Sequence, residues 1–172
     1  MSFRSKRRGS IRSERSQSLV EFALVVPMLL ILVFGVIDFG MGLRSYLSVA
    51  SATREGARFA VVGIPPGAFT SGGTGDCNGT TSTTTIGKVC ETLKGLNLSN
   101  VQSVTVESCS QASPPVCSAA TASNMLTGNS IRVTASYKYQ YITPVKRLIN
   151  VFSAGALGSY LTISSTTEMR ME

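Results

Sequence analysis

The sequence predicts an α+β protein in which one long N-terminal helix spans a membrane, extends outside the bilayer and packs on a small antiparallel sheet. Two observations predict this arrangement. The stretch from Leu19 to Leu43 carries only two charged residues, Glu21 and Asp38, and no proline follows until Pro65. Residues 131–141 alternate between apolar or aromatic and polar side chains, as a half-buried antiparallel strand requires. A sheet packed on the outer half of the helix would bury both apolar faces.

The first 16 residues form a basic leader, which we assign to the cytoplasm. They carry a net charge of +5, whereas residues 17–172 carry only +2. The basic character of the chain therefore belongs to this tail, and a nucleic-acid-binding arm is the less favoured interpretation. Because Ser and Arg prevail without apolar periodicity, we expect the leader to be disordered in solution.

The apolar stretch is long enough to cross a lipid bilayer. As a helix, Leu19 to Leu43 would span about 37 Å, against about 30 Å of hydrocarbon. A cleaved secretory signal peptide is the alternative, but its apolar core would be shorter and no clean Ala-x-Ala site follows. The basic leader places the N-terminus in the cytoplasm and the C-terminus outside.

The helix is expected to continue past the membrane over residues 17–62 and to end near Gly63, because two prolines follow. Small residues recur on one face of its outer half and would allow close packing. They are Ala50, Thr53, Ala57 and Val61.

Residues 63–172 are predicted to form an extracytoplasmic, disulfide-containing α+β domain. Periodicity predicts a short helix at about 84–95 and strands at 101–106, 131–141 and 160–171, with Leu161 and Ile163 facing inward in the last strand. Segments 65–85 and 109–128 are expected to be loops, and 145–157 a short helix or a packed loop.

Four cysteines lie in this domain: Cys77, Cys90, Cys109 and Cys117. An even number outside the cytoplasm indicates two disulfides, for which three connectivities exist. We favour the sequence-local pairs Cys77–Cys90 and Cys109–Cys117. A four-cysteine zinc site is the alternative, but no C-x-x-C spacing is present, so we predict no metal site.

Catalysis is not expected. The chain contains no histidine, which excludes Ser-His-Asp and Cys-His mechanisms and histidine metal ligands. It also shows no phosphate-binding loop, and we predict no cofactor.

Three segments carry a family resemblance: Ser16–Leu30, Ile37–Gly40 and Thr53–Ala60. They resemble the TadE-like family, pilin-like components of the tight-adherence (Tad, Flp-type) pilus system within the type IV pilin group. The segments 137–144 and 161–170 are more weakly similar. The resemblance implies a type IV pilin-like fold. It also implies a place in the bacterial inner membrane and, after assembly, in a cell-surface pilus. The implied partners are other pilin-like subunits, Tad inner-membrane assembly proteins and a prepilin peptidase.

The resemblance further implies cleavage by this membrane-embedded aspartic peptidase after Ser16, which would leave Gln17 as the N-terminus and Glu21 as the fifth residue. Glu21 could then neutralise the new α-ammonium of a neighbouring subunit. The family pattern has glycine before the cut, where this chain has Ser16. From local physics alone, Glu21 has a second explanation, because Ser18 to Glu21 fits an S-x-x-E capping box.

Two functional hypotheses follow. The first is a minor pilin or pseudopilin-like structural component of a Tad-type pilus or its assembly apparatus, with no enzymatic activity. The alternative is an unprocessed, single-pass envelope protein that binds a ligand through its outer domain; Ser16 in place of glycine favours this alternative.

Overall fold

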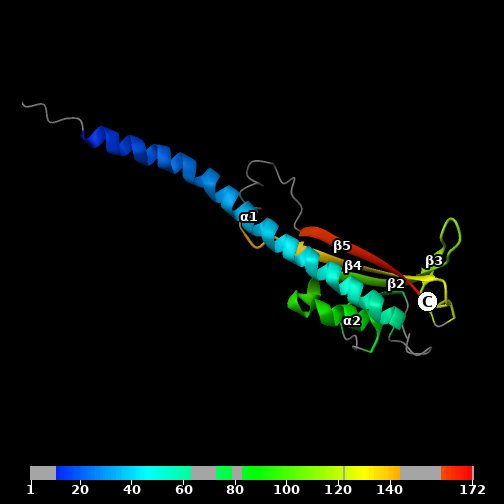
Figure 1. Ribbon diagram of the computed structural model, residues 1–172. Coiled ribbons are helices and arrows are strands. Elements are labelled where there is room, and N and C mark those ends of the chain that lie inside the picture. The colour runs from blue at the N-terminus through cyan, green and yellow to red at the C-terminus, as the bar shows by residue number, and fades with distance from the viewer. Residues whose placement is uncertain (1–10, 63–72, 79–82, 122, 144–159, 172) are drawn as a thin grey trace, which may run out of the picture.

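The computed structural model describes residues 11–62, 73–78, 83–121, 123–143 and 160–171. One long helix lies across an antiparallel sheet, with a short second helix beside it (Figure 1). The elements in chain order are α1 (Ile11–Val62), β1 (Gly73–Gly75), α2 (Thr85–Thr92), the 3-10 turns η1 (Leu93–Gly95) and η2 (Leu98–Asn100), β2 (Val101–Cys109), β3 (Cys117–Ala119), β4 (Ser130–Gln140) and β5 (Tyr160–Arg170). The predicted α+β fold class is confirmed.

Helix α1 is longer than predicted. It has 52 residues and ends at Val62 as expected, but it begins at Ile11 rather than at Gln17. The prediction of disorder is therefore wrong for residues 11–16, while residues 1–10 lie outside the described chain. The segment 11–16 contains no Gly or Pro, and extending an existing helix costs far less than nucleating one. The helix also continues through Pro27.

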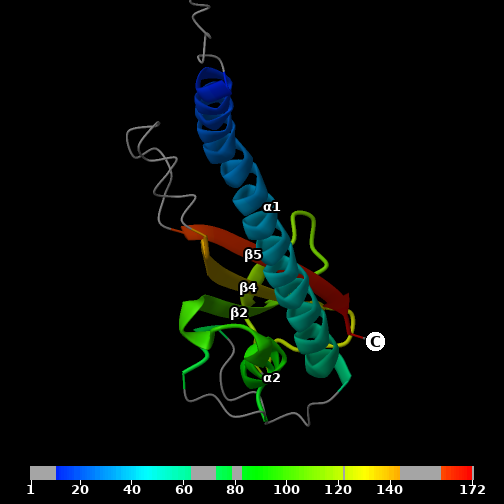
Figure 2. The ribbon, with the colours of Figure 1, turned by 90° about the vertical axis from the view of Figure 1, so that its left-hand side faces the viewer.

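The sheet has the strand order β1-β2-β4-β5, and β3 pairs with β2 off this path. All pairings are antiparallel, and β4 pairs with β5 along its whole length, from Ser130 opposite Arg170 to Gln140 opposite Tyr160. Figure 2 shows α1 crossing the face of β4 and β5, with α2 beside its C-terminal part. The helix and the sheet thus bury each other's apolar faces, as the sequence predicted.

The alternating face of β4 is buried as predicted, from Ile131 to Tyr139. In β5 the prediction holds for Ile163 and is wrong for Leu161, whose side chain is 51% exposed. The reason is that β5 is an edge strand and its first residues extend past the region that α1 covers (Figure 2). The short strands β1 and β3 fall where loops were predicted. Segment 145–157 lies outside the described residues.

The predicted short helix is present as α2 followed by η1. The hydroxyl of Thr84 caps α2 by accepting a hydrogen bond from the Gly87 N–H at 3.0 Å. Val89 of α2 is fully buried against Gly56 of α1, where an added Cβ would lie 2.3 Å from Val89 Cγ2. Gly56 therefore allows the two helices to approach this closely.

A methyl group at Gly56 should consequently weaken the fold. For Gly56→Ala we expect the free energy of unfolding to fall by about 1–2 kcal/mol. Overpacking costs about 1–3 kcal/mol, and the higher helix propensity of Ala offsets up to about 1 kcal/mol of that cost. Chemical unfolding of the detergent-solubilised chain would measure it. Gly40→Ala is the matched control, since an added Cβ there meets no atom within 4 Å. If both variants have the same stability, the packing explanation is wrong.

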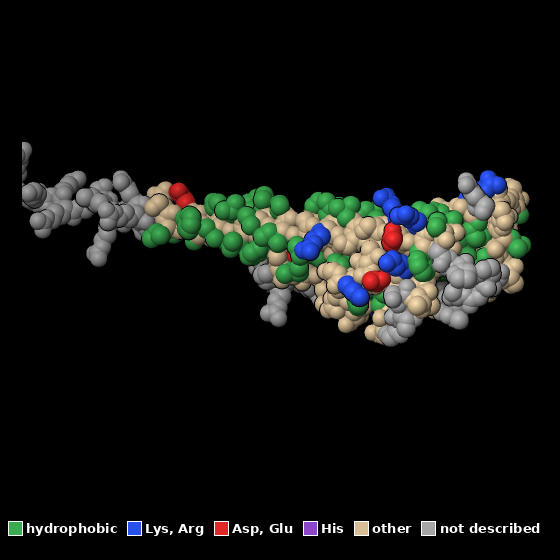
Figure 3. All heavy atoms as spheres, turned by 60° about the horizontal axis from the view of Figure 1, so that its bottom comes forward, with side chains coloured by type: hydrophobic (Ala, Val, Ile, Leu, Met, Phe, Trp, Pro, Cys, Tyr) green, Lys and Arg blue, Asp and Glu red, His purple; other side chains and the backbone are tan. Residues whose placement is uncertain are grey.

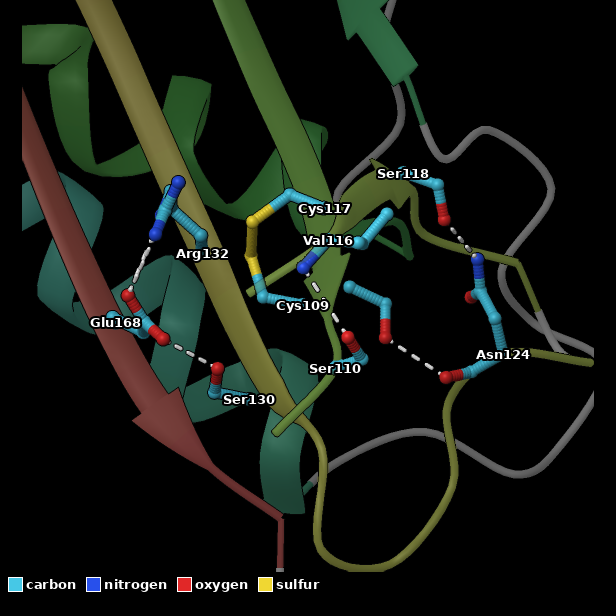
Figure 4. The surroundings of a disulfide bond; sticks show 10 residues. Cys109, Ser110, Val116, Cys117, Ser118, Asn124, Ser130, Arg132 and Glu168 are labelled. Atoms are coloured by element: carbon cyan, nitrogen blue, oxygen red, sulfur yellow. Dashed lines mark hydrogen bonds and ion pairs between the residues drawn. A yellow bond between two sulfur atoms is a disulfide. The ribbon is translucent and has the colours of Figure 1, made fainter. Parts of the chain in front are cut away.

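The structure contains the two disulfides favoured from the sequence. Cys77 is bonded to Cys90 of α2, and Cys109 at the end of β2 is bonded to Cys117 of β3. Figure 4 shows the second bond at the end of β2, with the side chain of Ser110 accepting from the N–H of Val116 at 3.2 Å. All four cysteine sulfurs are therefore paired in these two disulfides.

Loss of the Cys77–Cys90 bond should destabilise the outer domain most. This bond closes the longer loop, with a sequence separation of 13 against 8 for the other bond. Closing a loop of this length is worth about 3 kcal/mol on the chain-entropy estimate. Cys77→Ser with Cys90→Ser should therefore lower the thermal midpoint more than Cys109→Ser with Cys117→Ser does, because hydrogen bonds also hold the 109–117 loop closed. The opposite order would contradict this account.

Candidate functional site

The N-terminal half of α1 projects away from the sheet, and apolar side chains are exposed along the face of it that Figure 3 shows. Its most apolar 18-residue window has a mean hydropathy of 2.7, and none of that window is buried. Exposed large apolar side chains in this half include Leu19, Val20, Phe22, Leu24, Val25, Met28, Leu29, Leu32, Val36 and Phe39. In length and composition this segment suits a membrane anchor.

Glu21 lies on this exposed surface near the start of the apolar run. Its Oε1 accepts a hydrogen bond from Nε2 of Gln17, one turn earlier, at 3.2 Å. The capping-box interpretation is wrong for the intact chain, because α1 begins at Ile11 and Ser18 therefore lies inside the helix. Ser16 and Gln17 both lie within this continuous helix. The carboxylate of Glu21 thus lies within an apolar helix surface.

Asp38 is a structural residue whose role the sequence analysis did not identify. It is only 7% exposed although it follows the exposed half of α1. Its Oδ1 accepts from the backbone N–H groups of Ile142 at 3.1 Å and Thr143 at 3.3 Å, and its Oδ2 accepts from the Thr143 hydroxyl. This carboxylate therefore fastens the chain after β4 to the helix.

Tyr139 adds a second link between β4 and the same turn of α1. Its hydroxyl donates to the backbone carbonyl of Asp38 at 3.2 Å. Burial, with the nearby Asp38 charge as a smaller contribution, raises the pKa of Tyr139, so the hydroxyl remains a donor well above neutral pH. In the sequence, the only indication of this cluster is Asp38 itself, a second acid in an otherwise uncharged stretch.

The segment Thr53–Ala60 is explained mainly by packing. Thr53 is fully buried, and its Oγ1 lies 3.2 Å from Ser165 Oγ and 3.0 Å from Thr167 Oγ1 on β5. Arg54 and Arg58 point to the exposed side of the helix. The buried threonine and the close contact at Gly56 thus fix how α1 lies on the sheet and on α2.

Within the residues that the structure describes, these features define a protein with one candidate membrane-anchoring helix, whose outer half packs in the core of an α+β domain. Residues 17–58 match the family model described as TadE-like protein, which confirms the resemblance over this segment. The match covers most of α1 and ends before the sheet begins. No curated protein and no solved structure matches the chain.

Proposed function

We propose that this chain is a pilin-like or pseudopilin-like structural subunit of a Tad-type pilus or its assembly apparatus, without catalytic activity. The precursor crosses the inner membrane once, with its leader in the cytoplasm and its sheet outside. The observation that carries the proposal is the unburied apolar half of α1, which contains Glu21 and coincides with the TadE-like match.

Cleavage after Ser16 gives Glu21 its role in this proposal. The cut would create an α-ammonium at Gln17, at the end of an apolar helix whose macrodipole is also positive there. A bare positive charge next to hydrocarbon costs a few kcal/mol. The Glu21 carboxylate of a neighbouring subunit would offset this cost and set the stagger between adjacent helices. Other pilin-like subunits and Tad assembly proteins are accordingly the proposed partners.

The bond between Ser16 and Gln17 lies within the helix, so a peptidase would first have to unwind the initial turns of α1. Helix ends that lack tertiary packing open at little cost. Gln17 and Ser18 are exposed and precede the apolar stretch that begins at Leu19, so opening the helix around the cut would not place backbone groups in hydrocarbon. The proposed cut is therefore compatible with a helical precursor.

Fractionation tests the function. In cells that assemble a Tad pilus, we expect the chain to co-purify with the sheared pilus fraction or with the detergent-extracted assembly complex. A chain found alone in the membrane, with neither fraction containing it, would contradict the proposal.

The second candidate is a permanent, unprocessed anchor for an extracytoplasmic binding domain. The observation that favours it is Ser16 at the position where the family pattern has glycine. In this case Glu21 would have no partner subunit and its replacement would have little effect on localisation.

A further inference from the structure

We propose that the end of the sheet nearest the exposed half of α1 is a second membrane contact that rests on a phospholipid surface. This sheet end comprises residues 138–142, which are the last residues of β4 and the two that follow it, and Tyr160 and Leu161, the first two residues of β5. The inference rests on the proposal that α1 spans a bilayer. It adds a lipid-facing surface on the sheet, which the anchor alone does not require.

Helix geometry places the sheet end at the bilayer surface. A hydrocarbon layer of about 30 Å takes up about 20 helical residues, which from Leu19 reaches Asp38. Asp38 is the residue whose side chain binds the N–H groups of Ile142 and Thr143. The end of β4 is therefore fastened to α1 at the level where the hydrocarbon gives way to the headgroups.

The tyrosines of the chain are concentrated at this level. All five lie either on α1 just beyond Asp38 or at the facing ends of β4 and β5: Tyr46, Tyr137, Tyr139, Tyr141 and Tyr160. Tyr139 and Tyr141 form an edge-to-face pair with ring centroids 6.1 Å apart. Tyrosine is enriched at membrane–water interfaces, because its ring is apolar and its hydroxyl is polar. Tyr46 and Tyr160, each 47% exposed, can reach the interface, whereas Tyr137 and Tyr139 are buried and support the sheet end from within.

Exposed apolar side chains lie on both faces of this sheet end, because Tyr160 and Leu161 are consecutive in β5 and point to opposite faces. Ile142 is 64% exposed, Leu161 51% and Tyr160 47%, although each belongs to or adjoins the sheet. The Nζ of Lys138 lies 4.8 Å from the ring centroid of Tyr160. A lysine beside exposed apolar groups can extend its ammonium to lipid phosphates while its methylene groups stay among them.

Arg44 provides a second cation at the same level. It lines an open cavity of about 270 Å³ together with Asn97, Asn100, Tyr137 and Gln140. No Asp or Glu of the described residues lies within ion-pair distance of Arg44 or Lys138. Both cations are thus available to anionic headgroups. The sheet end is continuous with the exposed apolar surface of α1, which favours a bilayer as its occupant.

Depth-dependent fluorescence quenching tests the inference. The chain has no Trp, so single substitutions report their own surroundings. The full chain carrying Tyr160→Trp or Ile142→Trp would be reconstituted into phosphatidylcholine–phosphatidylglycerol vesicles with lipids brominated near the headgroups. We expect emission at shorter wavelength and strong quenching by bromine for both variants. Val116→Trp is the control, because Val116 is 66% exposed and precedes Cys117, which pairs with Cys109 at the opposite end of the sheet. Acrylamide alone should quench it.

Leu30→Trp separates the two proposals, because Leu30 lies near the middle of the apolar stretch. Lipids brominated deep in their acyl chains should quench Leu30→Trp. If they do, while Tyr160→Trp and Ile142→Trp behave like Val116→Trp, the inference is overturned and the anchor stands. If Leu30→Trp is not quenched, the anchor itself fails. If the sheet-end variants are shielded from both bromine and acrylamide, polypeptide of this chain or of a second copy covers the surface instead of lipid, which also overturns the inference.

Discussion

Replacement of Glu21 by Gln is expected to remove the chain from the assembled pilus or assembly complex while leaving it in the membrane. The substitution keeps the size and the helix, but it removes the negative charge that would neutralise a neighbouring α-ammonium. If that ammonium is left unpaired at a cost of about 3 kcal/mol, incorporation should fall about 100-fold. Immunoblots of the membrane and the sheared or co-purified fractions would measure the change.

Glu55→Gln is the matched control. Glu55 also lies on α1, but on the outer half, beyond the apolar stretch. Its replacement should leave incorporation at the wild-type level. If Glu21→Gln behaves as Glu55→Gln does, the assembly role of Glu21 is refuted and the permanent-anchor alternative is supported.

Replacement of Asp38 by Ala is expected to release the end of β4 from the helix. It would leave two backbone N–H groups and one hydroxyl without their acceptor in a part-buried setting. Hydrogen bonds to a charged group contribute about 1.5–3 kcal/mol each and are not additive, so we expect a loss of about 3 kcal/mol. Hydrogen exchange at the Ile142 and Thr143 amides, measured in detergent micelles, should accelerate first.

Asp38→Asn is the conservative comparison. Its carbonyl oxygen can still accept from the two amides, whereas its NH₂ group can no longer accept from the Thr143 hydroxyl. It should therefore fall between the wild type and Asp38→Ala in both stability and exchange rate. Unchanged exchange in Asp38→Ala would show that the carboxylate does not hold this turn.

Local patterns were sufficient to predict most elements of this fold. The strict alternation over 131–141 corresponds to β4, whose one face is covered by α1, and the prolines after Gly63 coincide with the end of α1 at Val62. Thr53 and Ala57 also lie in the buried interface, as their helical spacing indicated. These features depend on periodicity within one segment, which a sequence displays directly.

Features that depend on distant partners could not be predicted in the same way. Strand β1 is Gly-Thr-Gly, which has no strand pattern and is a strand only because it pairs with β2. Asp38 stood out as a second acid, but its bonding partners lie 101 to 105 residues further along the chain. The capping box of Ser18 and Glu21 failed because a helix start depends on where the helix can still propagate, here back to Ile11.

The N-terminus of the protein in its own membrane tests the central claim most directly. Mass spectrometry of the extracted chain, from cells with and without the prepilin peptidase, would identify its first residue. We predict a mature chain that begins at Gln17 in the peptidase-positive cells and a precursor with residues 1–16 still attached in the peptidase-negative cells. An intact leader in both would contradict the account of a processed, assembling subunit.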